Sequence, residues 1–288
     1  MISRIVAVSP VTLVLTVAVL AGCSGTGSAS GSGAGSPASA GYWTEQRLLA
    51  AQEFHPEDWT EPSAGAAPVA RQNAKTLRVG ALFDSDTSGG HFCTASVVDS
   101  PHNDVIVTAA HCLNSGNGGS DKRNVAFVPA YADGKAPYGI WEPAKYVMDP
   151  RWVKSADPDL DVAFVVLKSH DGKNIEQVLG ANKIEFDPGY AHEVRVTGYP
   201  ASVDAPIACD NRTVKQDPDY LEFACADFYG GTSGSPWVTG YNAQTRTGTI
   251  IGILGGYEEG GSTPDVSYSD YLGNDIQKLY DDAISAQG

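Results

Sequence analysis

The sequence has few basic residues. Its 288 residues include 19 Lys and Arg against 34 Asp and Glu, which gives a formal net charge of −15. Phosphate binding depends on clustered Lys and Arg side chains that release counterions, so this balance argues against nucleic acid as a partner. Hydrophobic residues make up 42% of the chain and aromatic residues 9%, which is too much for a disordered protein. We therefore expect one compact globular unit with appendages.

The apolar stretch near the N-terminus is shorter than a transmembrane helix requires. Arg4 precedes it, and it runs from Ile5 to Leu20 before ending in Leu-Ala-Gly-Cys at Cys23. That ending resembles the lipobox of bacterial lipoproteins, in which the cysteine becomes the lipidated first residue. We expect residues 1–22 to be a signal peptide and Cys23 to anchor the protein at the extracellular face of a bacterial cell membrane. The alternative is an ordinary cleaved signal, secretion and an unpaired thiol at Cys23.

Two further segments precede the expected domain at residues 78–288. Residues 23–41 form a linker in which nearly every residue after Cys23 is Ser, Gly, Ala, Thr or Pro, a composition that buries too little apolar surface to fold. Residues 42–77 start with a short helix that Thr44 would cap, followed by an acidic segment with several prolines. We interpret them either as a propeptide or as an arm that lies on the domain.

The cysteines after Cys23 are even in number, as expected for disulfides in an exported protein. They are Cys93, Cys112, Cys209 and Cys225. Three connectivities are open, and we favour the pairing of sequence neighbours, Cys93 with Cys112 and Cys209 with Cys225. A zinc site is the alternative, but the chain has no Cys-x-x-Cys pair and its closest His and Cys are adjacent, so we expect no metal.

After Lys75 the pattern is that of an all-β protein. Short runs rich in Val, Ile, Phe and Tyr alternate with clusters of Gly, Asp, Asn and Pro, which is typical of barrels or a sandwich. The runs are 77–83, 92–98, 105–109, 125–128, 162–167, 193–197 and 249–254. The C-terminal end differs, because Leu272, Ile276, Leu279, Tyr280 and Ala283 recur at helical spacing. This pattern predicts an amphipathic helix with one buried stripe.

The loop at residues 230–236, Gly-Gly-Thr-Ser-Gly-Ser-Pro, carries the strongest chemical signal. A serine between glycines can occupy a tight turn that exposes its hydroxyl. The backbone N–H groups of Gly231 and Ser233 would then converge on one point, where they would stabilise an oxyanion formed in acyl transfer. Such turns are also common in ordinary loops, so a nucleophile at Ser233 needs a base.

A histidine and an aspartate at the ends of apolar runs are the candidates for that base and its partner. His111 lies in Thr-Ala-Ala-His-Cys directly after an apolar run, and imidazole suits proton transfer near neutral pH. Asp161 is joined directly to the apolar run that follows it, so it is best placed for burial against His111. Asp157 and Asp159 flank a proline and are interpreted as solvated turn residues.

Three motifs in this order, Thr-Ala-Ala-His-Cys, Asp-Val-Ala-Phe and Gly-Thr-Ser-Gly-Ser-Pro, resemble the signatures of the chymotrypsin-like serine peptidases. The last is similar to the bacterial glutamyl-endopeptidase branch. The resemblance implies two six-stranded antiparallel β-barrels with a C-terminal helix. It also implies a serine endopeptidase with the catalytic residues His111, Asp161 and Ser233, an oxyanion hole at Gly231 and Ser233, and no cofactor. We expect a monomer that acts on polypeptides.

Chain order gives an independent check on this resemblance. An α/β-hydrolase needs a histidine after its nucleophile, but the last histidine is His192, before Ser233. A subtilisin needs its aspartate before its histidine, which Asp86 could supply, but it also needs βαβ alternation that this chain lacks. The remaining alternative is a lipid-tethered binding module that keeps the fold without catalysis.

The resemblance also suggests where substrate specificity is set. The position six residues before the nucleophile lies at the base of the family's primary pocket, and Asp227 occupies it here. An acidic base would favour Arg or Lys at the cleaved bond. The segment that would wall the pocket contains Gly255 and Gly256 but no histidine of the kind used by glutamate-specific relatives. Thr232 stands where trypsin-like enzymes carry an aspartate, so activation by a new amino terminus is not expected.

Overall fold

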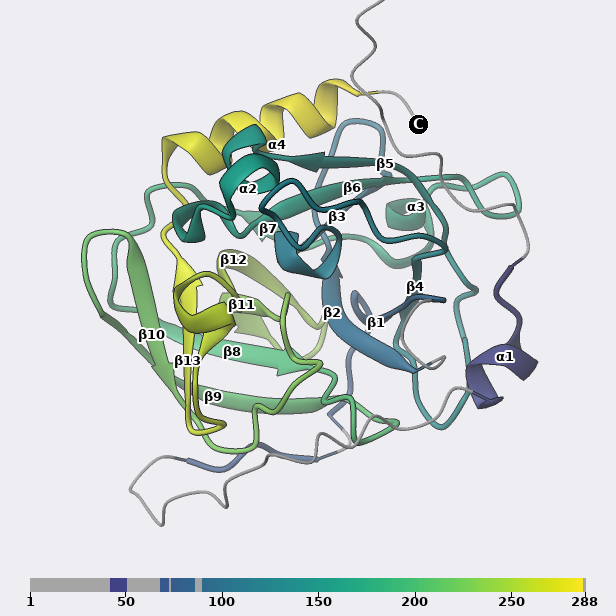
Figure 1. Cartoon of the computed structure of the whole chain (residues 1–288). Coiled ribbons are helices and arrows are strands. Elements are labelled where there is room, and N and C mark those ends of the chain that lie inside the picture. The colour runs from purple at the N-terminus through teal and green to yellow at the C-terminus, as the bar shows by residue number, and fades with distance from the viewer. Residues whose placement is uncertain (1–41, 51–67, 73, 86–89, 287–288) are drawn as a thin grey trace, which may run out of the picture. The chain divides into compact units, whose positions relative to one another are not determined.

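Two curled β-sheets form most of the protein, as Figure 1 shows. The structure is a computed structural model that describes residues 42–50, 68–72, 74–85 and 90–286. Outside these residues lie the expected signal peptide, Cys23, the linker and residues 51–67. The structure does not test the predictions made for them. No helix in the described part of the chain has the length and apolar character needed to cross a membrane.

The first sheet contains six antiparallel strands in the order β4-β1-β2-β3-β6-β5. The strands are β1 (Val79–Phe83), β2 (His91–Val97), β3 (Val105–Thr108), β4 (Ala126–Pro129), β5 (Pro143–Met148) and β6 (Ala163–Leu167). The residues of β1, β3, β4 and β6 are all buried, so these strands read as continuous apolar runs rather than as an alternation. The sheet therefore curls around a closely packed interior.

The second sheet has the order β13-β10-β9-β8-β11-β12-β7. Its strands are β7 (Lys183–Ile184), β8 (Glu193–Gly198), β9 (Ile207–Lys215), β10 (Tyr220–Ala224), β11 (Pro236–Asn242), β12 (Thr247–Ile253) and β13 (Val266–Asp270). Six strands pair antiparallel as expected, and the two-residue β7 adds a short parallel strand beside β12. The predicted chymotrypsin-like fold class is confirmed, with this one extra strand.

The helices are short except for the last. They are α1 (Glu45–Ala50), α2 (Pro150–Ser155), α3 (Ile175–Leu179) and α4 (Asn274–Ser285), with 3₁₀ turns η1 (Ala110–Cys112), η2 (Pro158–Leu160) and η3 (Tyr257–Gly260). Helix α4 lies along β5 and β6 of the first sheet in Figure 1. Its Ile276, Leu279 and Ala283 are buried in the core, as the helical spacing predicts. The C-terminus of the second half therefore packs on the first half.

Two disulfides join sequence neighbours, which confirms the favoured pairing. Cys93 bonds to Cys112 and Cys209 bonds to Cys225. The first ties β2 to η1, and the second ties β9 to the residue after β10. Each closes a loop of a length for which a disulfide typically contributes about 3 kcal/mol, by restricting the unfolded chain.

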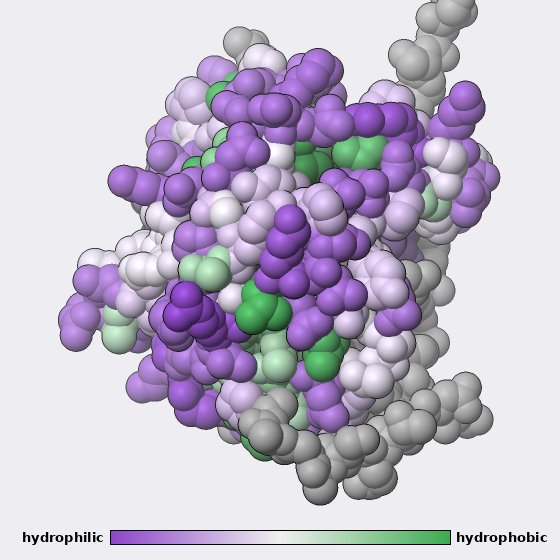
Figure 2. Space-filling view, turned by 90° about the vertical axis from the view of Figure 1, so that its left-hand side faces the viewer, coloured by the Kyte–Doolittle hydropathy of each residue, from purple (hydrophilic) through white to green (hydrophobic). Residues whose placement is uncertain are grey.

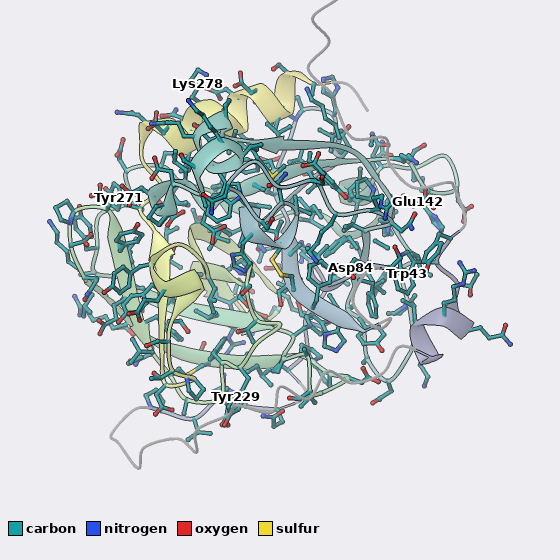
Figure 3. The ribbon with its side chains drawn as sticks, viewed as in Figure 1. Trp43, Asp84, Glu142, Tyr229, Tyr271 and Lys278 are labelled. Atoms are coloured by element: carbon teal, nitrogen blue, oxygen red, sulfur yellow. A yellow bond between two sulfur atoms is a disulfide. The ribbon has the colours of Figure 1, made fainter. Side chains whose placement is uncertain are left out.

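The described parts of the N-terminal arm contact the domain. The Trp43 indole N–H donates to the carbonyl of Asn124 at 2.6 Å, and its ring meets Phe83 edge-on at 5.4 Å. Figure 3 shows Trp43 near Asp84, at the end of β1. Residues 68–72 run beside the second half, where the Arg71 N–H donates to the Ala208 carbonyl at 2.7 Å. The described parts of residues 42–77 therefore contact both halves of the domain, as either an arm or a propeptide would.

The surface is polar over much of its extent. Figure 2 shows a face that is mostly hydrophilic, on which the described hydrophobic residues are separate rather than joined in one broad patch. The large exposed hydrophobic side chains are likewise scattered along the described chain, at Val69, Tyr138, Val178, Val214 and Tyr257. Single exposed apolar residues of this kind are ordinary in soluble domains and indicate no docking surface.

Candidate active site

His111 is held at the point where a buried strand leaves the first sheet. Strand β3 is buried throughout, and η1 follows it directly, so the chain turns sharply at His111. The next residue, Cys112, is bonded to Cys93 on the neighbouring strand β2. The His111 side chain remains 21% exposed. A rigid backbone thus presents an imidazole that solvent and substrate can reach.

The Asp161 carboxylate binds both the side chain and the backbone of His111. Its Oδ2 lies 2.6 Å from Nδ1 of His111, and its Oδ1 accepts the His111 backbone N–H at 2.8 Å. The Gly256 N–H donates to Oδ2 as well, at 2.9 Å. The Asp161 side chain is only 1% exposed. Three donors therefore surround a buried carboxylate, which satisfies its charge and fixes the imidazole orientation.

The two neighbouring aspartates have other roles. Asp157 accepts the backbone N–H of Asp159 and caps η2. Asp159 is exposed and accepts a short hydrogen bond from the Tyr220 hydroxyl. Neither makes a hydrogen bond to His111 that the structure shows. Burial next to an apolar strand therefore distinguishes Asp161 from the other two.

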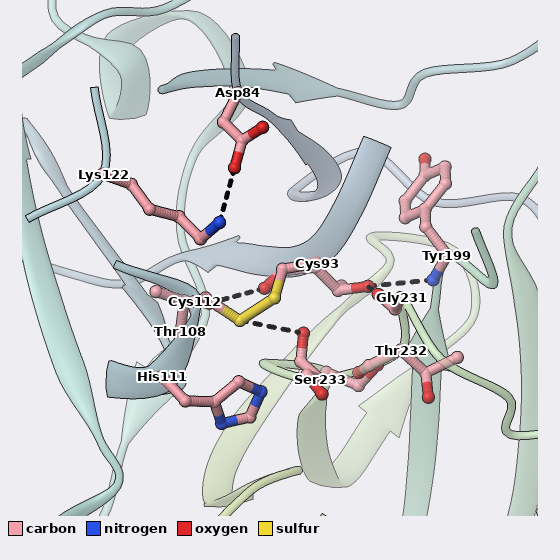
Figure 4. Close-up of a disulfide and its surroundings, with 12 residues drawn as sticks. Asp84, Cys93, Thr108, His111, Cys112, Lys122, Tyr199, Gly231, Thr232 and Ser233 are labelled. Atoms are coloured by element: carbon pink, nitrogen blue, oxygen red, sulfur yellow. Dashed lines mark hydrogen bonds and ion pairs between the residues drawn. A yellow bond between two sulfur atoms is a disulfide. The ribbon is translucent and has the colours of Figure 1, made fainter. Parts of the chain in front are cut away.

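The turn that carries Ser233 reaches across from the second half to the first. The Ser233 carbonyl accepts the Thr94 N–H at 2.7 Å and lies 3.8 Å from Sγ of Cys112. A ring nitrogen of His111 lies within 4.8 Å of that same sulfur. Figure 4 shows the His111 ring beside Ser233, with the disulfide above them in this view. The structure therefore brings the three residues singled out in the sequence into one region.

Glycine is required on both sides of Ser233. Gly231 has φ +97°, and a Cβ there would overlap the backbone of Tyr199 and Ala201. Gly234 has φ +85°, and a Cβ there would overlap the Thr94 carbonyl. Left-handed conformations and close backbone approach both favour glycine over any other residue. The loop sequence thus allows the tight turn on which an exposed serine hydroxyl depends.

Comparisons with known proteins agree with this geometry. The sequence matches the trypsin-like peptidase domain over residues 93–253, which is more than half of the chain. The chain belongs to this family. No protein among the curated proteins matches it.

Solved structures with the same fold include two bacterial or extremophile proteases. The protease Anisep from Arthrobacter nicotinovorans is 26% identical, with a TM-score of 0.65 over 75% of this chain and 99% of that chain. The thermostable serine protease AL20 from an extremophilic microorganism is 30% identical, with a TM-score of 0.65 over 74% and 99% of the two chains. A Glu endopeptidase shares the fold at 15% identity, with a TM-score of 0.61 over 77% and 99%.

The residues expected to bind substrate lie on two separate segments of this trypsin-like peptidase. Asp227 is half-buried and has φ +76°, an unusual conformation for a residue other than glycine. The segment with Gly255 and Gly256 follows β12, and the Gly256 N–H is already bound to Asp161. Asp265 was missed in the sequence. Its carbonyl accepts the Cys225 N–H, and its buried Oδ1 has no hydrogen-bond partner among the described residues.

Thr94 is a second residue that sequence reasoning gave no role. Its hydroxyl donates to the Gly231 carbonyl at 3.0 Å and accepts the Tyr199 N–H at 2.9 Å. Together with its N–H bond to Ser233, this fixes the turn from both sides. Thr94 lies in the expected apolar run at residues 92–98, but nothing in that run indicates contacts 137 residues away.

One cluster has the ligand types of a metal site. Ligand atoms of Cys93, His111 and Cys112 lie within 4.8 Å of one another. The two sulfurs are bonded to each other, so neither is available as a thiolate ligand. This cluster therefore does not fit a metal ion.

Proposed function

We propose that the protein is an exported serine endopeptidase that hydrolyses peptide bonds through Ser233, His111 and Asp161. The observation that carries the proposal is the short contact between His111 Nδ1 and a buried Asp161 carboxylate, beside the Ser233 turn of a trypsin-like peptidase domain. Because Nδ1 is engaged by Asp161, Nε2 is the nitrogen that remains to act as a base.

The reaction follows from these positions. His111 Nε2 accepts the Ser233 hydroxyl proton as Oγ attacks the peptide carbonyl, and Asp161 stabilises the imidazolium that forms. The N–H groups of Gly231 and Ser233 hydrogen-bond to the tetrahedral oxyanion. His111 then gives its proton to the leaving amine, and water releases the acyl group from Ser233 by the same steps in reverse. Polypeptide is the substrate class, and no cofactor enters the scheme.

A serine-directed phosphonate tests this proposal against a non-catalytic binding module. Such a reagent reacts only where a serine is activated by its neighbours. We expect it to attach at Ser233 of the wild type and to leave the Ser233→Ala variant unlabelled, as peptide mapping by mass spectrometry would show. Wild-type protein that stays unlabelled would favour the binding module.

We also propose that Asp227 favours Arg or Lys at the cleaved bond. Asp227 stands six residues before Ser233, and the buried, unpartnered Oδ1 of Asp265 adds a second acidic group near the segment around Cys225. We expect Asp227→Ser to lower kcat/KM for Arg amide substrates by roughly 10²-fold, the loss typical of an unpaired charge in a binding site. The kcat/KM for Glu amide substrates should stay nearly unchanged. An unchanged Arg to Glu ratio would contradict the assignment, and Asp219→Ser serves as an exposed control.

The N-terminal arm is proposed to limit activity until it is removed. The Ala226 N–H donates to the Pro68 carbonyl at 2.8 Å, so the arm pairs with the residue next to Asp227. Arg71, Lys75 and Arg78 are the candidate cut sites. The Arg78 guanidinium binds the Thr245 and Arg246 carbonyls, and burial lowers its pKa, whereas Lys75 is exposed. Arg71 is held by backbone hydrogen bonds with Ala208 and by its side-chain contact with Asp210, so we propose cleavage after Lys75.

Two chains of different length test the role of the arm. We expect a chain that starts at Leu77 to have a higher kcat/KM than one that starts at Tyr42, because the arm no longer covers the backbone next to Asp227. The two proteins should have similar melting temperatures if the domain folds without the arm. Equal activity in both would show that the arm has no inhibitory role.

Export and lipid attachment complete the proposal. Residues 1–22 are proposed as the signal peptide and residues 23–41 as the tether, with the lipid on Cys23. Incorporation of a labelled fatty acid into the wild type, and its loss in Cys23→Ser, would support the anchored form. Wild-type protein that is found in the culture medium and carries no label would support secretion instead.

A further inference from the structure

A second aspartate is buried behind Asp161. Asp270 is the last residue of β13, it is only 1% exposed, and neither of its carboxyl oxygens has a hydrogen-bond partner among the described residues. Asp161 is buried to the same degree but accepts three hydrogen bonds. An unpaired buried polar group is costly, so a role for Asp270 has to be sought in what it touches.

Gly256 lies between the two carboxyl groups. Its N–H donates to Asp161 Oδ2, and a Cβ on Gly256 would overlap Oδ1 of Asp270 and come within 3.1 Å of the Tyr220 ring. Gly256 has φ +77°, so the backbone itself turns in the left-handed region. The Asp270 carboxyl therefore packs directly against the Gly256 backbone, on the side where another residue would carry its side chain.

The charges around Asp270 are negative. Burial, and then Asp161, Asp159 and Asp157, raise the pKa of Asp270 well above its usual range, while the Asp161 backbone amide offsets part of this rise. The Tyr220 phenol lies opposite Asp270 on the neighbouring strand β10, and its own pKa is also raised by burial, whereas Glu222 of that strand pairs with Tyr268. Two adjacent buried carboxyls cannot both ionise easily, and Asp161 is the one that accepts hydrogen bonds.

We propose that Asp270 is a positioning residue which, as an uncharged carboxylic acid, fills the space against Gly256 and keeps the Gly256 N–H directed at Asp161. An uncharged group of this shape supports the backbone without repelling the Asp161 carboxylate. An ionised Asp270 would instead raise the pKa of His111, so that more of the imidazole would already be protonated and unable to accept the Ser233 proton. The role in turnover rests on the proposed function, because it acts through Asp161 and His111.

The test separates charge from shape with two variants, Asp270→Asn and Asp270→Ala. The pKa of His111 is measured by NMR in a Ser233→Ala background, so this reading does not depend on activity. Asp270→Asn replaces one uncharged group by another of the same shape, and we expect the His111 pKa to stay within about 0.2 of its starting value. Asp270→Ala removes the support from Gly256, so Asp161 loses a donor and the His111 pKa should rise by about 0.5.

Turnover is measured in the same two variants with Ser233 intact. We expect Asp270→Asn to keep kcat within about threefold and Asp270→Ala to lower kcat roughly tenfold with little change in KM, since orientation of His111 rather than substrate binding is affected. Thermal unfolding of each variant checks that the protein folds. If Asp270→Ala does not fold, the His111 pKa in Asp270→Asn still decides whether Asp270 is charged.

Two results would overturn the proposal. A fall of about one unit in the His111 pKa on Asp270→Asn would mean that Asp270 carries a negative charge in the native protein. If both variants keep the His111 pKa and the kcat of the protein with Asp270, the contact with Gly256 has no effect on the site. If Ser233→Ala keeps wild-type turnover, the proposed function fails, while the NMR result still decides the charge of Asp270.

Discussion

Replacing Ser233 with alanine is expected to lower kcat by roughly 10⁶-fold, the loss found when the nucleophile of such a triad is removed. The hydroxyl is the attacking atom in the proposed reaction, and neither His111 nor the oxyanion donors can replace it. The residual rate should remain above that of the uncatalysed reaction, because substrate binding and the oxyanion donors persist. Steady-state and active-site-titration measurements with a peptide amide would show the loss.

A second serine in the same loop provides the matched control. Ser235 lies two residues further on, is fully buried, and donates its hydroxyl to the Thr232 carbonyl at 2.6 Å. Ser235→Ala should cost about 1 kcal/mol of stability for the lost hydrogen bond and keep most of the turnover. Ser233→Ala should unfold at the wild-type temperature, since Ser233 contacts Thr94 and Cys112 only through its backbone carbonyl. Wild-type activity in Ser233→Ala would refute the assignment.

The sequence is most informative where a functional residue adjoins a buried strand. Asp161 could be chosen from three aspartates because it alone is joined directly to the apolar run of β6, and the structure buries it against His111. The glycines around Ser233 likewise indicate a tight turn, and their φ angles agree. Local pattern is sufficient in these cases because neighbours in the chain determine both burial and backbone conformation.

Contacts between distant segments could not be predicted in this way. Gly256 donates to Asp161 across 95 residues, and the need for glycine there comes from its left-handed backbone and from the Asp270 carboxyl beside it. The sequence alone gives Asp270 no role. Strand β7 could not be predicted either, because its two residues form a strand only through their parallel pairing with β12. Such features depend on the final packing of the two halves.

The Asp161→Asn variant is expected to lower kcat by about 10⁴-fold, the loss typical of this substitution in a serine peptidase triad. Both carboxylate oxygens accept N–H groups, from the His111 backbone, its Nδ1 and Gly256. A carboxamide has one oxygen for these donors, and its NH₂ group would meet a donor. His111 would then carry its proton on Nε2 and could not accept the one from Ser233.

Asp159→Asn is the control for this substitution, because Asp159 is exposed, two residues away and bonded to Tyr220 rather than to His111. It removes the same charge from the same turn, so a general electrostatic effect of the acidic segment would lower kcat in both variants. A loss confined to Asp161→Asn, with no shift in melting temperature large enough to indicate unfolding, would show that the orientation of the imidazole is what fails. Equal activity in the two variants would mean that the contact between Asp161 and His111 is structural, and the proposed base would then lack the partner that sets its tautomer.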